Sequence, residues 1–233
     1  MNRKRTFYLF LFTLSLFLLS PVFLIAYQDS CSIRVACVGD SITYGAKIEN
    51  RFLNSYPSRL QQLLGGKYLV KNFGASGYTL QKNSNFSYWD HKNFEKSSDF
   101  EPDYVLIMLG TNDTKPYYWT GTENFLKDYR DLISHYRSLE SNPQIILMTP
   151  ATVYPENFPA VRPYFIQSDI ADTIADAVIH LGEDEQLPVI DIHRATAFHP
   201  DYFSLDGVHP SASGAAEIAS LAYETIKNLE KRE

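Results

Sequence analysis

The sequence predicts an α/β fold in which helices cover both faces of a parallel sheet. Short apolar runs, rich in β-branched residues, alternate with segments of helical periodicity from residue 32 onward. Several of these runs end abruptly at small or polar residues, as in Val38-Gly39-Asp40-Ser41. Open parallel sheets bind ligands just beyond the carboxyl ends of their strands, so such endings suit a functional site. No repeat or linker is visible, and we expect one domain over residues 32–231.

The first half of the predicted sheet has three strands. The apolar run 33–39 is the first, and it ends where a glycine bends the chain. A helical pattern over 55–64 is stopped by a glycine pair, and a short strand, 68–73, follows it. The aromatic and polar segment 78–100 is long enough to be functional or to carry a small helix. The most apolar run, 104–109, is expected to be a buried strand that breaks at a glycine.

The second half continues the alternation. A helical period over 123–140 precedes an apolar strand, 144–149, which ends at a proline. After a proline-rich, aromatic loop, residues 166–181 are helical by period. A fifth strand is expected over 188–192 and a closing amphipathic helix over 212–229.

Residues 1–27 are not expected to belong to the domain. Three basic residues at positions 3–5 precede an almost unbroken apolar run from Phe7 to Ala26, and this order is typical of an export signal. The run is close to the roughly 20 residues that span a bilayer, and its end is a poor match to a cleavage site. A cleaved signal peptide and an uncleaved signal anchor both stay open, and either places the domain outside the cytoplasm.

Charge and cysteine content exclude several kinds of partner. Without the three basic N-terminal residues the formal net charge falls from −6 to −9, which argues against nucleic acid and anionic membrane surfaces. Contact with a membrane is expected only through the N-terminal segment. Cys31 and Cys37 are too far apart to bridge on an extended segment that rises about 3.3 Å per residue. Cys37 is expected to be a buried strand residue, and no cysteine-based metal site follows.

Residues that carry chemistry gather in four segments, each just after a predicted strand or before the last helix. They are Gly39-Asp40-Ser41, 74–77, Gly110-Thr111-Asn112-Asp113 and Asp206-Gly207-Val208-His209-Pro210. A serine needs an adjacent base to act as a nucleophile, and that base needs a fixed tautomer. The Asp-x-x-His spacing lets one short turn hold a base and the group that orients it.

In order and spacing, these four segments resemble those of the SGNH hydrolases, also called the GDSL family. The resemblance covers essentially the whole predicted domain. It implies a three-layer α/β/α sandwich with a five-stranded parallel sheet, the flavodoxin-like SGNH hydrolase fold, with no cofactor and no metal. It also implies that Ser41 is the nucleophile, His209 its general base and Asp206 the residue that orients His209. The backbone N–H groups of Ser41 and Gly77 and the side-chain amide of Asn112 would form the oxyanion hole.

The role of Gly77 rests on Ser76-Gly77-Tyr78-Thr79, which resembles the Ser-Gly-x-Thr element of the family. The family often has aspartate where this chain has Tyr78. The Gly-x-Ser-x-Gly pattern of a nucleophile elbow is absent around Ser41, which argues against an α/β-hydrolase fold.

Structural interpretations of the same residues stay open. Capping would account singly for the polar residues at 40–41 and at 112–113. Asp206 could be a turn residue near a helix, and His209 could be a surface histidine. A zinc site built from His193, His199 and His209 is conceivable because histidine binds zinc. No pair of these ligands at helical spacing supports it.

The expected function is that of a serine esterase that acts through an acyl-enzyme on Ser41. The segments 36–45 and 110–116 most resemble those of carbohydrate O-acetylesterases, including sialate O-acetylesterase-like bacterial catalytic domains. This implies an acetyl ester of a glycan or of a small molecule as the substrate. The aromatic and polar loops 78–100, 115–120 and 151–164 are expected to rim the site, and their rings would offer platforms for sugar faces. The alternatives are a lysophospholipase or thioesterase of the same fold and a non-catalytic glycan-binding module. The binding module would lack a catalytic residue, and none is missing.

Overall fold

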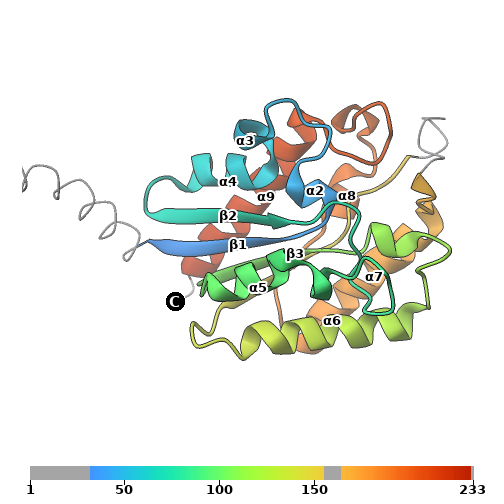
Figure 1. The fold of residues 1–233 in the computed structure, drawn as a ribbon. Helices are drawn as coiled ribbons and strands as arrows, with labels where there is room; N and C mark the ends of the chain where they lie inside the picture. Colours follow the sequence, from blue (N-terminus) through green and yellow to red (C-terminus); the bar gives the residue numbers. More distant parts are fainter. Residues whose placement is uncertain (1–31, 155–163, 232–233) are drawn as a thin grey trace, which may run out of the picture.

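Five parallel strands form the central sheet, in the order β2-β1-β3-β4-β5. The computed structural model describes residues 32–154 and 164–231 (Figure 1). The strands are β1 (Ile33–Gly39), β2 (Tyr68–Gly74), β3 (Tyr104–Met108), β4 (Gln144–Met148) and β5 (Val189–Ile190). Every neighbouring pair is parallel. The sheet confirms the predicted α/β class and the five parallel strands.

The register of the central strands brings their carboxyl ends to one edge of the sheet. Gly39, the last residue of β1, pairs with Gly74 of β2 and with Met108 of β3. The segments that follow these three strands therefore leave the sheet side by side. They carry three of the predicted site residues, Ser41, Gly77 and Asn112.

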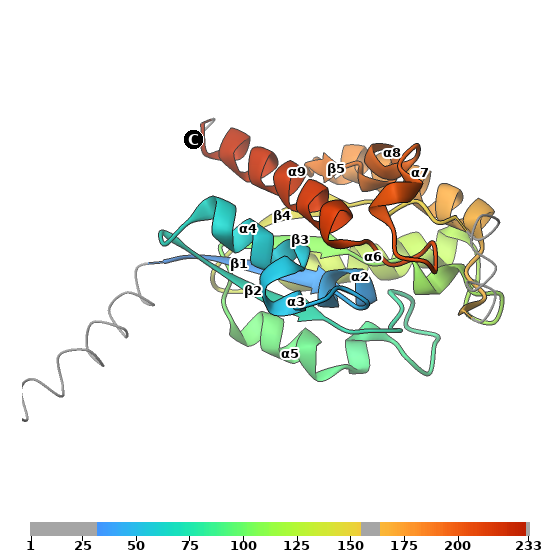
Figure 2. The same cartoon turned by 90° about the horizontal axis from the view of Figure 1, so that it is seen from above.

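The helices cover both faces of the sheet. The longer helices are α4 (Tyr56–Leu64), α5 (Lys92–Asp99), α6 (Thr122–Arg137), α7 (Ser168–Glu185) and α9 (Ala212–Glu230). Short helical turns are α2 (Ser41–Tyr44), α3 (Arg51–Asn54), α8 (Ile192–Thr196), η1 (Tyr88–Asp90), η2 (Asn112–Thr114) and η4 (Pro200–Tyr202). Helices α4 and α9 lie on one face, and α5, α6 and α7 lie on the other (Figures 1 and 2).

Alternation along β1 divides the core into two halves. Val35 and Cys37 pack with α4 and α9, whereas Ala36 and Val38 pack with α6 and α7. All four side chains have no exposed surface, which is the pattern of a strand covered on both faces. Cys37 is a free, buried thiol as expected, and burial raises its pKa far above the usual range. Cys31 lies outside the described residues.

The predicted fifth strand is too long by three residues. Residues 188–192 were expected to be extended, but β5 ends at Ile190. The side chain of Asp191 accepts a hydrogen bond from the backbone N–H of Arg194 at 2.9 Å and so caps the short helix α8. The strand β5 therefore stops before Asp191, which caps α8 instead of continuing the strand.

The segment 78–100 contains η1 and α5, so the small helix that its length allowed is present. Its aromatic residues pack largely inward rather than forming a loop surface. Tyr88 is completely buried and donates a hydrogen bond to the carbonyl of Phe73 at 2.8 Å. Trp89 packs against the core beside α6 and donates to the carbonyl of Leu80.

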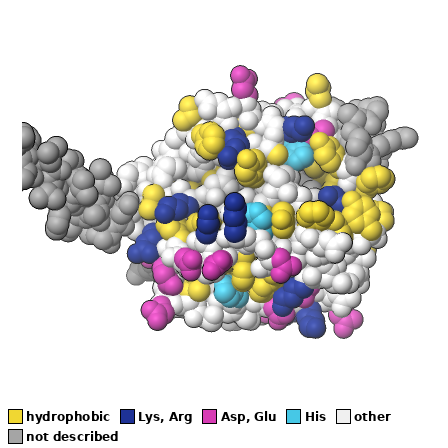
Figure 3. Space-filling model, viewed as in Figure 1, with side chains coloured by type: hydrophobic (Ala, Val, Ile, Leu, Met, Phe, Trp, Pro, Cys, Tyr) yellow, Lys and Arg dark blue, Asp and Glu magenta, His cyan; other side chains and the backbone are white. Residues whose placement is uncertain are grey.

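On the face shown in Figure 3, acidic and basic side chains are interspersed, and hydrophobic side chains gather toward the end where β1 and β2 finish. Among the described residues, no helix combines the length and hydrophobicity that crossing a membrane requires. The predicted export segment, residues 1–27, lies outside the described residues.

Candidate active site

Ser41 is the first residue of α2, directly beyond the carboxyl end of β1 (Figure 1). Asp40 is the N-cap of this turn, and its Oδ1 accepts the backbone N–H of Ile42 at 2.8 Å. Gly74, at the end of β2, lets the turn pack closely, because a Cβ atom there would lie 2.2 Å from the backbone nitrogen of Tyr44. The capping that was an alternative explanation for Asp40 therefore also fixes the position of Ser41.

A chain of hydrogen bonds connects Ser41 to a carboxylate. The Nε2 atom of His209 lies 2.9 Å from Ser41 Oγ, and its Nδ1 atom lies 2.7 Å from Asp206 Oδ2. All three side chains are almost fully buried. The structure thus brings together the predicted nucleophile, base and orienting residue. Ser41 and His209 are 168 positions apart in the sequence. This arrangement is the one that general-base activation of a serine requires.

Asp206 is held in its ionised form. Its Oδ1 atom accepts the backbone N–H groups of Val208 and His209 and the hydroxyl of Ser204, at 2.8–3.0 Å. Burial opposes ionisation, but the hydrogen bonds from the side chain and backbone of His209 outweigh it and hold the pKa of Asp206 well below its usual range. An ionised Asp206 accepts the Nδ1 proton of His209, which leaves Nε2 free to accept the proton of Ser41.

Asn112 and Gly77 lie beside Ser41. Asn112 begins η2, four residues after β3 ends at Met108, and its Nδ2 atom donates to the carbonyl of Tyr78 at 3.1 Å. Gly77 has a backbone φ of +87°, a conformation that residues other than glycine rarely adopt. Ser41, Gly77, Asn112 and His209 line one pocket of about 320 Å³. The residues expected to donate to an oxyanion thus share a cavity with the predicted nucleophile.

Tyr78, which departs from the family pattern, does not line this pocket. Its ring packs against His91, at 4.5 Å between ring centroids, and against Phe86 at 5.8 Å. Only its backbone carbonyl takes part in the site, as the acceptor for Asn112. The substitution therefore leaves the positions of Gly77 and Asn112 in the pocket intact.

Asp113 ties two loops of the site together. Its carboxylate oxygens accept the backbone N–H groups of Leu80 at 2.9 Å and Gln81 at 2.8 Å. It is completely buried, and burial raises its pKa to about 6 although these hydrogen bonds oppose the shift. Asp113 thus does more than cap a turn, because it fastens the segment that carries Gly77 to the segment that carries Asn112.

Two of the three loops expected to rim the site contribute to the pocket, through Lys115 and Tyr164. Lys47 and Ile166 also line it and were not anticipated from the sequence. The rings of Tyr164 and His209 form a T-shaped pair, 5.7 Å apart between centroids. The prediction that the aromatic residues of segment 78–100 rim the site was wrong, because none of them lines the pocket. Nothing in the sequence distinguishes an aromatic residue that packs inward from one that faces a ligand.

The three histidines of the alternative zinc site have separate partners. His209 contacts Ser41 and Asp206, whereas His193 Nε2 lies 3.1 Å from a carboxylate oxygen of Asp172. His199 stacks on the ring of a neighbouring tyrosine. Among the residues that the structure describes, no three His, Cys, Asp or Glu side chains are arranged to hold a metal ion.

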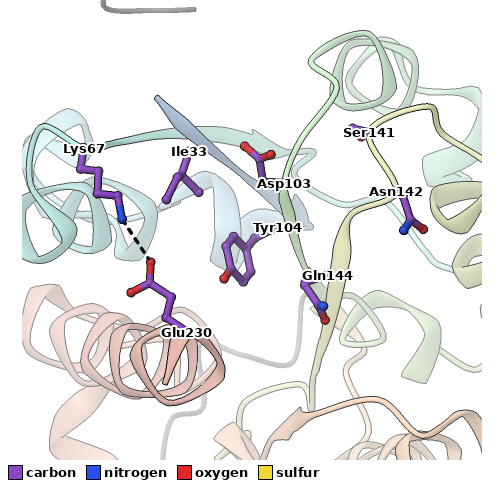
Figure 4. A pocket seen from close by; sticks show the side chains of 8 residues that line it. All are labelled: Ile33, Lys67, Asp103, Tyr104, Ser141, Asn142, Gln144 and Glu230. Carbon is purple, nitrogen blue, oxygen red and sulfur yellow. Dashed lines mark ion pairs between the residues drawn. The ribbon is translucent and has the colours of Figure 1, made fainter. Parts of the chain in front are cut away.

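A larger hollow of about 650 Å³ lies at the opposite edge of the sheet (Figure 4). Ile33, Tyr104 and Gln144, which begin β1, β3 and β4, line it together with the ion pair of Lys67 and Glu230, 3.9 Å apart. Among the described residues that line it there is a serine, Ser141, but no histidine that could act as its base. The larger of the two cavities is therefore not the one that the predicted site residues line.

The family model described as "GDSL-like Lipase/Acylhydrolase family" matches residues 37–217. The chain belongs to the GDSL-like lipase/acylhydrolase family. This confirms the predicted resemblance, and the match spans all four segments from which it was inferred.

Two curated relatives are esterases by name. The chain is 33% identical over 215 residues to an acetylxylan esterase of Xylanibacter ruminicola, and the match covers 84% of this chain and 43% of the relative. It is 27% identical over 138 residues to the uncharacterized esterase YxiM of Bacillus subtilis, over 54% of this chain and 34% of that protein. The chain therefore spans less than half the length of these relatives. Family and relatives support a carboxylic ester hydrolase.

Solved structures show the same fold. The aryl esterase of M. smegmatis superposes with a TM-score of 0.69 at 19% identity, over 85% of this chain and 100% of that one. A carbohydrate acetylesterase family member from Sinorhizobium meliloti gives a TM-score of 0.68 at 20% identity, over 83% and 97% of the two chains. At these identities the likeness establishes the SGNH hydrolase architecture of this family member.

The position of Asn112 predicts a defined catalytic loss. Asn112→Ala is expected to lower kcat by roughly 10²–10³, the usual cost of one oxyanion donor, with a smaller change in KM. Steady-state kinetics on p-nitrophenyl acetate check this, with Asn124→Ala on the exposed side of α6 as the matched control. An effect mainly on KM would show that Asn112 binds the substrate in its ground state instead.

Proposed function

We propose that this protein is a serine esterase that removes acetyl groups from carbohydrates through an acyl-enzyme on Ser41. The observation that carries the proposal is the hydrogen-bond chain from Ser41 through His209 to Asp206, at 2.9 and 2.7 Å, inside a pocket that Asn112 and Gly77 also line.

The geometry supports a two-step reaction. Ser41 Oγ attacks the ester carbonyl while His209 Nε2 takes its proton, and the carbonyl oxygen becomes an oxyanion that Asn112 and backbone N–H groups stabilise. The protonated His209 then donates its proton to the leaving alcohol, which leaves the acyl group on Ser41. In the second step His209 takes a proton from water, the hydroxide equivalent attacks the acyl-enzyme, and the acid product leaves with Ser41 Oγ reprotonated.

The size of the pocket favours a short acyl group. At about 320 Å³ it lies at the lower end of the roughly 300–1,000 Å³ typical of ligand sites. The name of the acetylxylan esterase relative, at 33% identity, supports the acetyl group and the glycan together. A lysophospholipase would need room for a long acyl chain, since each buried methylene contributes about 0.8 kcal/mol.

Exposed aromatic rings beside the pocket support a carbohydrate substrate. Tyr117 is 61% exposed and Phe165 is 59% exposed, and their ring centroids lie 6.3 Å apart. Phe165 lies between the pocket residues Tyr164 and Ile166, and Tyr117 follows the pocket residue Lys115 by two positions. Exposed rings of this kind pack well against the apolar faces of sugars.

We propose further that the domain works outside the cytoplasm, because the basic and then apolar pattern of residues 1–27 is typical of an export signal. Fractionation of cells that express the full chain, followed by immunodetection, tests this. Recovery of the protein in the cytoplasmic fraction would contradict it.

The substrate proposal predicts how activity depends on acyl length. On p-nitrophenyl esters, kcat/KM is expected to be highest for acetate and to decline by butyrate, because a small pocket resists longer chains. Acetate release from acetylated xylo-oligosaccharides is measured beside it. A rise in kcat/KM through octanoate would contradict the acetylesterase and favour the lysophospholipase or thioesterase.

A further inference from the structure

The charge of the active-site pocket differs in sign from that of the whole chain. The chain has a formal net charge of −6, yet the pocket that Ser41 lines is also lined by two lysines, Lys47 and Lys115. None of the described residues that line it is an aspartate or glutamate. A cleft lined by one sign of charge attracts ligands of the opposite sign.

Lys115 is the more constrained of the two lysines. It follows η2, three residues after Asn112, and is partly buried, whereas Lys47 is exposed. Its Nζ atom lies 5.9 Å from the ring centroid of Tyr118. Within the described part of the chain, no carboxylate forms an ion pair with either lysine.

Two buried carboxyl groups, those of Asp40 and Asp113, lie near enough to Lys115 for their charges to act on it. Asp113 accepts two backbone N–H groups. Asp40 caps α2 through Oδ1, while its buried Oδ2 has no hydrogen-bond partner among the described residues. Burial lowers the pKa of Lys115, and the charges of Asp40 and Asp113 oppose that shift. They favour the ammonium form of Lys115, while the side of the pocket that receives substrate presents no acidic group from the described residues.

We propose that Lys115, assisted by Lys47, selects esters of acidic carbohydrates by binding a carboxylate that the sugar carries near its acetyl group. This rests on the proposed function and names the substrate class of the same site. A partly buried ammonium without an ion-pair partner gains most from an anion that the substrate brings to it, because both charges are then withdrawn from bulk water. An acidic sugar suits a pocket of about 320 Å³. An anionic phospholipid would also bring a long acyl chain, for which a pocket of this size has little room.

The test uses two monoacetylated methyl glycosides that differ only at C6, a glucuronide with a carboxylate and a glucoside with a hydroxymethyl group. We expect the protein to prefer the glucuronide by about tenfold in kcat/KM, mainly through KM, and to lose part of this preference at high salt. Lys115→Met is expected to bring the ratio of kcat/KM for glucuronide over glucoside close to one. Lys115→Arg, which keeps the positive charge, is expected to retain the preference. Lys67→Met is the matched control, because Lys67 lies at the opposite edge of the sheet (Figure 4) and should leave the ratio unchanged.

A binding experiment separates this inference from the proposed function. The Ser41→Ala variant is titrated with the same two glycosides and followed by NMR, so that no turnover is needed. Tighter binding of the glucuronide, abolished by adding Lys115→Met, supports charge selection even if the unmodified protein hydrolyses no ester. Equal binding of the two glycosides, or a preference that persists in the double variant, overturns it. Hydrolysis of an anionic lysophospholipid in preference to both glycosides also overturns it.

Discussion

Ser41→Ala is expected to lower kcat on acetyl esters by roughly 10⁶, the loss that follows removal of a catalytic serine. Ser41 Oγ is the atom that His209 Nε2 contacts at 2.9 Å, and no hydroxyl other than that of Ser41 is hydrogen-bonded to this base among the described residues. The alanine variant keeps the oxyanion hole but cannot form an acyl-enzyme. Kinetics on p-nitrophenyl acetate measure the loss.

Ser76→Ala is the matched control, because Ser76 lines the same pocket but is exposed, and the ring of His209 is hydrogen-bonded to Ser41 and Asp206 instead. It should cost far less activity than Ser41→Ala. The melting temperature of Ser41→Ala should stay close to that of the unmodified protein, since the change removes one hydroxyl. Turnover in Ser41→Ala at a rate similar to Ser76→Ala would remove Ser41 from its role.

Asp206→Asn is expected to lower kcat by about 10⁴ while leaving the fold intact. The amide presents an N–H group toward His209 Nδ1, 2.7 Å away in the present structure, and so favours the tautomer with a proton on Nε2. That tautomer cannot accept the proton of Ser41. Near-normal kcat in the variant would show that another carboxylate orients His209.

The same variant makes a prediction about stability and pH. The pKa of Asp206 is depressed in the folded protein, so its ionised form contributes stability above the unfolded pKa of about 3.9. That contribution is lost as the pH falls toward the depressed pKa. Urea unfolding between about pH 5 and pH 2.5 should show the difference between the unmodified protein and Asp206→Asn shrinking as the pH falls. A difference independent of pH over this range would contradict the ionised state of Asp206.

The sheet and the triad could be predicted because their signals are local. One apolar run ends at Gly39, where β1 stops, and another breaks at Gly110, two residues beyond the end of β3. The parallel order then brings the loops after these strands to one edge. The Asp-x-x-His spacing places Asp206 and His209 on one turn. The fifth strand was predicted too long because the apolar run continues on both sides of Asp191. Only the hydrogen bond from Arg194 to Asp191 shows that this residue caps a helix.

The rest of the site depends on contacts between segments far apart in the chain. Asp113 binds the backbone of Leu80 and Gln81, more than 30 positions away, and no local pattern indicates such a pairing. Lys115 is one of many lysines in the sequence, and only the shape of the pocket distinguishes it. The segment 78–100 was expected to rim the site, but its Tyr88 and Trp89 pack into the core, and an aromatic residue in a polar segment is compatible with either position.

Stoichiometric labelling with a fluorophosphonate, followed by mass spectrometry of the peptides, tests the central claim most directly. A serine activated by His209 and Asp206 attacks this reagent through Oγ and retains it as a covalent adduct. We predict one adduct per chain, located on Ser41, and none in Ser41→Ala or after acid unfolding of the protein. Absence of an adduct from the folded, unmodified protein, or an adduct on another serine such as Ser76, would contradict the assignment of Ser41 as the nucleophile.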